Sequence, residues 1–474
     1  MLFNSLIFPA FFVLVIIVYY QINLKWQNRW LLIASYFFYG WWDWRFCTLL
    51  IFSTVLDWTI SHALHKTTDL RKRKQFLTIS LLGNLGVLGF FKYFNFFAGS
   101  LQVLLANIGF NPDMFTLNII LPMGISFYTF QTLAYTIDVY RGKTEPADDF
   151  TAFALYVSFF PQLVAGPIER AKRLLPQLTN ARVMGYATLR SGIPLIMFGY
   201  FKKVVIADSL SPLVESTFNN PGMYSNIDLW FGVYAFAIQI YCDFSGYTDI
   251  ARGIARMLGI ELMSNFSAPY FSRSITEFWR RWHISLSSWL KDYLYVSLGG
   301  NRKGKTRTYA NLMVTMLIGG LWHGAAWTFV IWGGIHGLYL AIHKLMLKGE
   351  KPDIQAWGVG PLGYFSDLIK IVFTFHLVSF TWVFFRAPSF DVSIQYLKGM
   401  IVNSGELTIF PQVSLALIAI VIIDIAQRYS KDYSWVFRIK PYWRYVLTGS
   451  LLGASILVFG WHYSSPTPFI YFQF

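Results

Sequence analysis

The chain has 474 residues, of which 55% are hydrophobic, 19% aromatic and only 13% charged. A soluble domain carries roughly 25% charged residues, so this chain has about half the charge that a water-facing surface needs. The composition argues against a soluble enzyme, a secreted disulfide scaffold and a disordered protein. We attribute the net charge of +15 to Lys and Arg in the cytoplasmic loops of a membrane protein and not to binding of nucleic acid.

Long apolar runs occur from end to end and predict a polytopic, all-α membrane protein with one domain over residues 1–474 and about twelve spans. In chain order, the predicted spans are 5–21, 30–42, 46–64, 76–96, 117–138, 191–208, 228–245, 308–322, 325–346, 363–385, 412–426 and 445–463. Most Lys and Arg fall on one side if the N-terminus is outside, so both termini are predicted to be extracytoplasmic.

Two stretches predicted on the inner side are too apolar for free loops. In 151–168, Pro161 and Gly166 would break a continuous helix. In 273–297, apolar residues recur at helical spacing between basic ones, which predicts an amphipathic helix at the membrane interface. Because irregular backbone at membrane depth needs protein or water around it, both stretches favour re-entrant or interfacial helices around a funnel open to the cytosol.

The eight histidines are the first candidates for chemistry, and they occupy positions 62, 65, 283, 323, 336, 343, 376 and 462. The sequence has no HExxH motif and no histidine pair four residues apart, so no metal site is predicted. It also lacks a P-loop and a GxSxG elbow, which argues against a motor ATPase and an α/β-hydrolase.

His323 follows a predicted helix, 308–322, of only about 22 Å, against a hydrocarbon core of about 30 Å. The histidine is therefore expected deep in the membrane, between glycines that allow other backbone to approach. It is interpreted either as a functional residue or as a neutral histidine in helix packing.

His283 lies one turn after Trp279 on the predicted amphipathic helix. It is either an active-site residue or an interfacial histidine whose ring reaches toward water. We expect packing roles for His336, His343 and His376.

The acids of the stretch Tyr241–Asp249 have three possible roles. Asp243 and Asp249 could orient a histidine, bind a cation, or pair with Arg252 or Arg256 for structure.

Several of these stretches together resemble a known family, the membrane-bound O-acyltransferases, and in particular its bacterial alginate O-acetyltransferase branch. The stretches that carry the resemblance are Phe160–Ile168, Asp243–Tyr247, Phe278–Leu286, Leu298–Arg302 and Leu321–Gly324. The resemblance implies that His323 is the catalytic histidine and His283 the second active-site histidine. It also implies a funnel that crosses the bacterial inner membrane, acetyl-CoA as the cytosolic acyl donor, and an extracytoplasmic SGNH-type acyltransferase as partner for an exported polysaccharide.

The C-terminal segment 464–474 carries a second resemblance. Its last residues, Pro468–Phe474, are similar to the FIYF-x-F ending of related acyl-export systems, including the small partner peptide of teichoic acid D-alanylation. The resemblance implies that Tyr471 carries the acetyl group, with His323 as general base for its hydroxyl. A phenol of pKa ~10 is a better leaving group than a sugar alkoxide, so the ester would stay activated. The alternative is an interfacial aromatic anchor.

Two other functions remain open from the sequence. One is a non-covalent transporter of an acetyl donor or a lipid-linked sugar. The other is a member of the same superfamily that acylates a lipid or a protein. The polymer is equally open between alginate, cellulose and peptidoglycan.

Overall fold

The computed structural model describes residues 1–110, 117–347, 358–430, 433–461 and 469–470. Within these residues every regular element is a helix, which confirms the predicted all-α fold. Contacts divide the chain into two units, Met1–Gly192 with Ile254–Met263 and Ile193–Gly253 with Ser264–Phe474.

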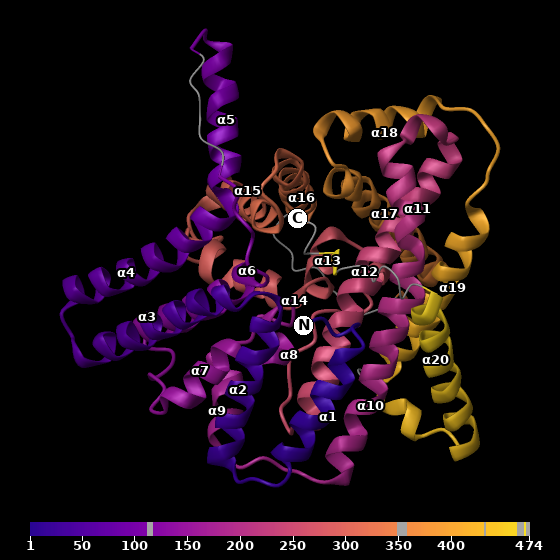
Figure 1. Cartoon of the computed structure of the whole chain (residues 1–474). Helices are drawn as coiled ribbons and strands as arrows, with labels where there is room; N and C mark the ends of the chain where they lie inside the picture. Colours follow the sequence, from indigo (N-terminus) through magenta and orange to yellow (C-terminus); the bar gives the residue numbers. More distant parts are fainter. Residues whose placement is uncertain (111–116, 348–357, 431–432, 462–468, 471–474) are drawn as a thin grey trace. The chain divides into compact units, whose positions relative to one another are not determined.

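In the first unit, α3 packs against α4 and α6, and α2 packs against α7 (Figure 1). Its elements are α1 (Ile7–Tyr19), α2 (Leu24–Asp43), η1 (Trp44–Phe46), α3 (Cys47–Lys66), α4 (Leu70–Leu88), η2 (Gly89–Tyr93), α5 (Phe94–Asn107), α6 (Ile125–Tyr140), α7 (Phe150–Ser158), α8 (Phe160–Leu163) and α9 (Ala171–Thr179).

The second unit contains most of α12, a helix whose last residues belong to the first unit, and the hairpin of α15 and α16. The elements from the unit boundary onward are α10 (Tyr186–Tyr200), η3 (Phe201–Asp208), α11 (Ser209–Asn219), η4 (Pro221–Met223), α12 (Asn226–Met257), η5 (Pro269–Phe271), α13 (Ile275–Arg281), α14 (Ile284–Trp289), η6 (Leu290–Tyr295), α15 (Gly304–His323), α16 (Trp327–Met346), α17 (Gly360–Arg386), α18 (Phe390–Val402), α19 (Phe410–Ser430), η7 (Tyr433–Phe437) and α20 (Pro441–Trp461).

Side chains at the helix starts explain several of these boundaries. Asp69, Asp149 and Ser274 each precede a helix and accept hydrogen bonds from backbone N–H groups of its first turn. Those N–H groups have no partner within the helix, so a capping oxygen stabilises each start.

Five described helical segments are long and apolar enough to cross a membrane: Leu24–Lys66, Leu70–Asn107, α12, α16 and α17. Shorter apolar helices lie at Ile7–Tyr19, Phe150–Leu163 and Val413–Gln427. The chain is therefore a multi-pass membrane protein, whereas the count of about twelve spans and the position of the termini remain predictions.

The apolar stretch 151–168 is broken as predicted. Helix α7 ends at Ser158, and the short α8 ends before Gly166. A Cβ on Gly166 would lie 2.3 Å from the Cα of Gln162, so a larger residue would clash with the backbone there.

Candidate active site

His323 is the last residue of α15, which lies along α16 (Figure 1). The two helices approach closely because glycines face backbone. A Cβ on Gly320 would lie 2.2 Å from the carbonyl oxygen of Phe329, and a Cβ on Gly333 would lie 2.2 Å from that of Met316. The expected role of glycines in close backbone approach is thus confirmed at Gly320.

The predicted boundaries of this helix were wrong. Helix α15 has 20 residues, Gly304–His323, because a polar first turn precedes the apolar stretch 308–322. At 1.5 Å per residue it is about 30 Å long, which is as long as the hydrocarbon core is thick. A short helix therefore does not explain the burial of His323.

Aromatic rings bury His323 instead. The residue is only 4% exposed, and its ring centroid lies 5.0 Å from that of Trp322, 5.1 Å from Trp332 and 5.3 Å from Phe385. These rings come from α15, α16 and α17 and surround the imidazole with apolar surface. In such surroundings electrostatic interactions are stronger than in water.

The continuous amphipathic helix expected over 273–297 is interrupted at His283. Helix α13 ends at Arg281 and α14 begins at Ile284, while His283 between them has a left-handed backbone with φ 43° and ψ 56°. This conformation costs a non-glycine residue roughly 1–2 kcal/mol, so the surroundings must hold it. His283 is also fully buried, so the interpretation as an interfacial histidine reaching toward water is wrong.

The segment 265–267 holds the backbone on both sides of His283. The Asn265 carbonyl accepts a hydrogen bond from the Ile284 N–H at 2.9 Å, and its side-chain Oδ1 accepts one from the Ser285 N–H at 3.2 Å. On the other side, the Ser267 N–H donates to the Arg281 carbonyl at 3.0 Å, and the Arg281 Nη1 donates to the Ser267 carbonyl at 3.1 Å. These bonds offset the cost of the left-handed conformation.

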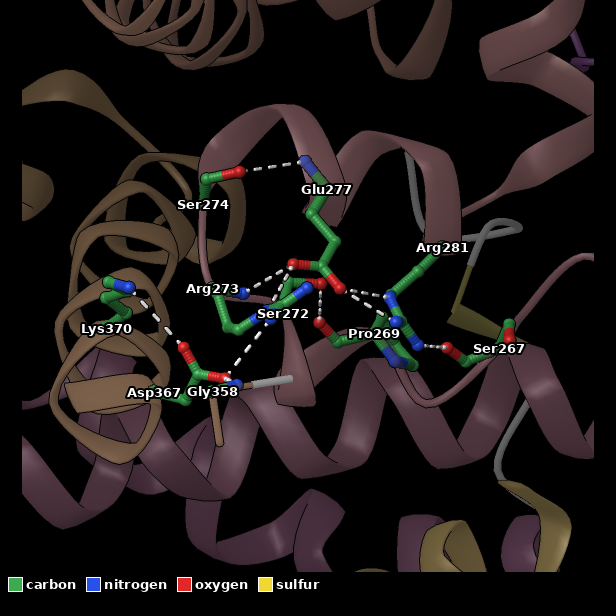
Figure 2. Close-up of polar contacts among 10 residues, drawn as sticks. All are labelled: Ser267, Pro269, Ser272, Arg273, Ser274, Glu277, Arg281, Gly358, Asp367 and Lys370. Carbon is green, nitrogen blue, oxygen red and sulfur yellow. Dashed lines mark hydrogen bonds and ion pairs between the residues drawn. The ribbon is translucent and has the colours of Figure 1, made fainter. Parts of the chain in front are cut away.

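Buried ion pairs fix α13 at its two ends. Figure 2 shows the Glu277 carboxylate between the side chains of Arg273 and Arg281. The Arg281 Nη2 donates to Glu277 at 2.7 Å, and the Arg273 Nη1 donates to Asp367 of α17 at 3.1 Å. The helix that leads to His283 is therefore tied to α17 at its start and to residue 267 at its end.

The two predicted histidines meet in this unit. Their ring centroids lie 6.4 Å apart with an angle of 62° between the ring planes. The ring of Phe244 from α12 contacts His283 edge-on at 4.6 Å. Burial lowers the pKa of His283, which lies outside the spanning helices, to about 3, so its imidazole is neutral near pH 7.

Three other histidines of the second unit, His336, His343 and His376, have partners typical of the packing roles expected for them. His336 is fully buried, accepts a hydrogen bond from Trp279 Nε1 at 3.3 Å and lies 2.9 Å from the Thr381 hydroxyl. His343 and His376 each contact a hydroxyl group from another helix.

Asp243 and Asp249 both form buried ion pairs. Of the three possible roles, this arrangement corresponds to the structural one. Asp249 contacts Arg252, one of the two arginines considered, at 3.3 Å, and also Lys202 at 2.5 Å. Asp243 Oδ1 contacts Lys203 Nζ at 2.6 Å. Sequence analysis did not assign either lysine as a partner of these acids, although two adjacent lysines inside an apolar run were a signal that buried acids would face them.

Two residues of the C-terminal segment are described, Phe469 and Ile470, and both are buried beside α12. The Ile470 N–H donates to Asp243 Oδ2 at 2.7 Å, and the Phe469 ring centroid lies 5.6 Å from that of Phe244. Tyr471, the predicted acetyl carrier, lies outside the described residues. Among the described residues, no cluster of His, Cys, Asp and Glu could hold a metal ion.

Comparison with known proteins identifies the family. The profile of the membrane-bound O-acyltransferase family matches residues 147–387, which is half of the chain. The chain belongs to the membrane-bound O-acyltransferase family. It is therefore an O-acyltransferase, and the matched region contains both His283 and His323.

Individual members of the membrane-bound O-acyltransferase family match over longer ranges. A probable alginate O-acetylase of Azotobacter vinelandii is 41% identical over 90% of this chain and 84% of its own length. One from Pseudomonas putida is 38% identical over the whole of both chains. A peptidoglycan O-acetyltransferase of Helicobacter pylori is 36% identical over 81% of this chain and 76% of its own.

Proposed function

We propose that this protein moves acetyl groups from cytosolic acetyl-CoA across the bacterial inner membrane for O-acetylation of an exported polysaccharide. The observation that carries the proposal is the buried pair His283–His323, whose rings are 6.4 Å apart within the family-matched region. Acetylation of a polysaccharide is supported by the names of the relatives, which act on alginate or peptidoglycan.

The chemistry is acyl transfer with His323 as general base. His323 takes the proton of the Tyr471 hydroxyl while the phenol oxygen attacks the thioester carbonyl of acetyl-CoA. The new O–C bond forms, the C–S bond breaks, and His323 returns the proton to the departing thiolate. His283, neutral because it is buried, donates a hydrogen bond to the carbonyl oxygen as negative charge develops there.

Acetyl-tyrosine then passes the group outward. Its phenolate is a better leaving group than a sugar alkoxide, so the ester remains reactive toward the serine of an extracytoplasmic SGNH-type acyltransferase. That partner would transfer the acetyl group to a sugar hydroxyl. The position of Phe469 and Ile470 beside Asp243 and Phe244 supports this route, because Ile470 directly precedes Tyr471 in the sequence.

Labelled acetyl-CoA tests the proposal. The purified protein in lipid nanodiscs should acquire one acetyl group on Tyr471, detected by mass spectrometry of the C-terminal peptide. His323→Ala and Tyr471→Phe should each abolish the label while the protein remains folded.

The two alternatives give different results in the same assay. A non-covalent transporter would leave no acetyl on the protein, and an enzyme acting on lipids would place the label in the lipid fraction. Unchanged polymer acetylation in cells with Tyr471→Phe would refute the tyrosine step.

A further inference from the structure

Asp243 has two oxygens, and each serves a different partner. Oδ1 contacts Lys203 Nζ at 2.6 Å, and Oδ2 accepts the Ile470 N–H at 2.7 Å. Asp243 is only 2% exposed and Lys203 only 4%. A carboxylate so buried needs a partner for each oxygen, and the backbone of the C-terminal segment supplies the second one.

Lys203 is shared between two acids. Besides Asp243, it contacts Asp208 at 2.8 Å. Lys203 occupies Oδ1 of Asp243, so Oδ2 is the oxygen that accepts the N–H of residue 470.

Two aromatic residues of α12, Phe244 and Tyr247, form a contact site for Phe469 beside the Asp243 carboxylate. The Phe469 ring lies 5.6 Å from Phe244 and 5.0 Å from Tyr247, measured between centroids. Phe244 in turn contacts His283 at 4.6 Å. One side chain and one N–H of the segment are thus held at neighbouring positions of a single helix that also contacts the active-site histidine.

We propose that Asp243, supported by Lys203, is a positioning residue that docks the C-terminal segment and sets its register at the active site. The recognition is of two kinds. Asp243 binds the main chain of residue 470, so this contact does not depend on the identity of the buried side chain there. The contact site formed by Phe244 and Tyr247 binds the ring of Phe469, so position 469 requires an aromatic residue.

The docking role depends on the proposed function in one respect only, namely that its purpose is to present Tyr471 to the active site. A slip of one residue would place Ile470 or Phe472 where Tyr471 belongs, and neither has a hydroxyl group. The hydrogen bond itself is a separate claim and is tested without acetyl-CoA.

Hydrogen exchange of the full chain in nanodiscs measures the contact directly. The Ile470 amide should exchange at least tenfold more slowly than in an unfolded peptide of the same sequence. Asp243→Ala should remove this protection. Asp208→Asn is the matched control because it alters the other partner of Lys203 and should retain the protection.

Photocrosslinking gives a second measurement. A benzoylphenylalanine in place of Phe469 should crosslink to the α12 peptide that contains Phe244 and Tyr247. Ile470→Pro, which has no N–H, should lower the yield at least fivefold, whereas Ile470→Val should not. An unprotected Ile470 amide in the parent protein, or an equal loss with Asp208→Asn, would overturn the proposal.

The acetylation assay separates the two claims. If Tyr471 is acetylated at the normal rate in Asp243→Ala, the docking role is wrong and the proposed function stands. If the amide is protected and the crosslink forms but Tyr471 never carries acetyl, docking stands and the tyrosine step is wrong. Tyr471→Phe should abolish acetylation and leave both docking measurements unchanged.

Discussion

Replacing Asn265 with alanine should impair catalysis through the backbone of His283, without touching a reacting group. Asn265 is fully buried, and its Oδ1 accepts the N–H of Ser285, which is buried as well. Alanine removes this acceptor but keeps the backbone carbonyl that accepts the Ile284 N–H. The variant therefore loses one of the bonds that hold the left-handed conformation at residue 283.

The expected loss of kcat follows from the hydrogen bond between the Ser285 N–H and Asn265 Oδ1. A buried N–H left without a partner costs about 1–3 kcal/mol, comparable to the roughly 1–2 kcal/mol strain of a left-handed non-glycine residue. Residues 283–285 should therefore relax toward ordinary backbone geometry and move the imidazole. A displacement of about 1 Å in an active site can cost on the order of 100-fold in rate. We expect a ten- to hundredfold loss of kcat, with a nearly unchanged KM for acetyl-CoA.

The assay is transfer of labelled acetyl to the protein, normalised to folded protein measured by thermal unfolding in nanodiscs. Asn311→Ala is the matched control, because Asn311 is also buried and donates to the Leu298 and Gly300 carbonyls of a neighbouring segment. It should lose stability without the fall in kcat. Equal effects of the two variants on kcat would refute the reasoning.

Four further predictions concern packing, ion pairs and protonation in the second unit. Gly333→Ala should prevent normal packing of α15 on α16, because the new Cβ would lie 2.2 Å from a carbonyl oxygen. Gly334→Ala is the control and should be tolerated, because its Cβ would lie 3.4 Å from a flexible Leu317 methyl. The yield of folded protein in size-exclusion chromatography compares the two variants. Glu277→Gln removes a buried charge that faces Arg273 and Arg281 and should lower stability by ~3 kcal/mol. Lys370→Met breaks the ion pair of a half-exposed side chain and should change stability by at most ~1 kcal/mol. Thermal unfolding measures both variants, and a loss for Lys370→Met as large as that for Glu277→Gln would contradict the prediction. The pKa of His283 is about 3 in the folded state, below an ordinary value of ~6.5, so the unfolded state binds more protons between these values. The free energy of unfolding should therefore fall as pH is lowered from 6.5 toward 3, and this contribution should be constant above pH 6.5. The fall should be shallower in His283→Gln, and the same pH dependence in the parent protein and the variant would contradict the prediction.

The fold class could be predicted from the sequence because its signal is local, since apolar runs identify helices. A histidine between glycines at the end of such a run made His323 a candidate, whereas its pairing with His283 was implied only by the family resemblance. The break at His283 had no comparable signal. Trp279, Trp282, Leu286 and Trp289 keep helical spacing straight through it, with no glycine or proline at the break. Hydrogen bonds from residues 265–267 impose the left-handed turn, and such tertiary contacts override a local periodicity.

The start of α15 was missed for a different reason. Its first turn contains Lys305 and Arg307, so a hydropathy pattern does not count it as part of the span. Charged residues can continue a helix beyond its apolar stretch because the backbone hydrogen bonds do not depend on the side chains. For α15, the span estimated from hydropathy is therefore shorter than the helix.

The scarcity of charge gives the buried ion pairs their significance. In lipid, apolar side chains gain little by leaving one apolar environment for another, so helix packing alone specifies position weakly. Directional polar contacts can supply what packing does not. Glu277 with its two arginines fixes α13 before His283, and Lys203 with Asp243 meets the C-terminal segment beside Phe244. In this protein, part of a small total charge therefore lies at contacts that hold α13 next to His283 and residues 469–470 next to Phe244.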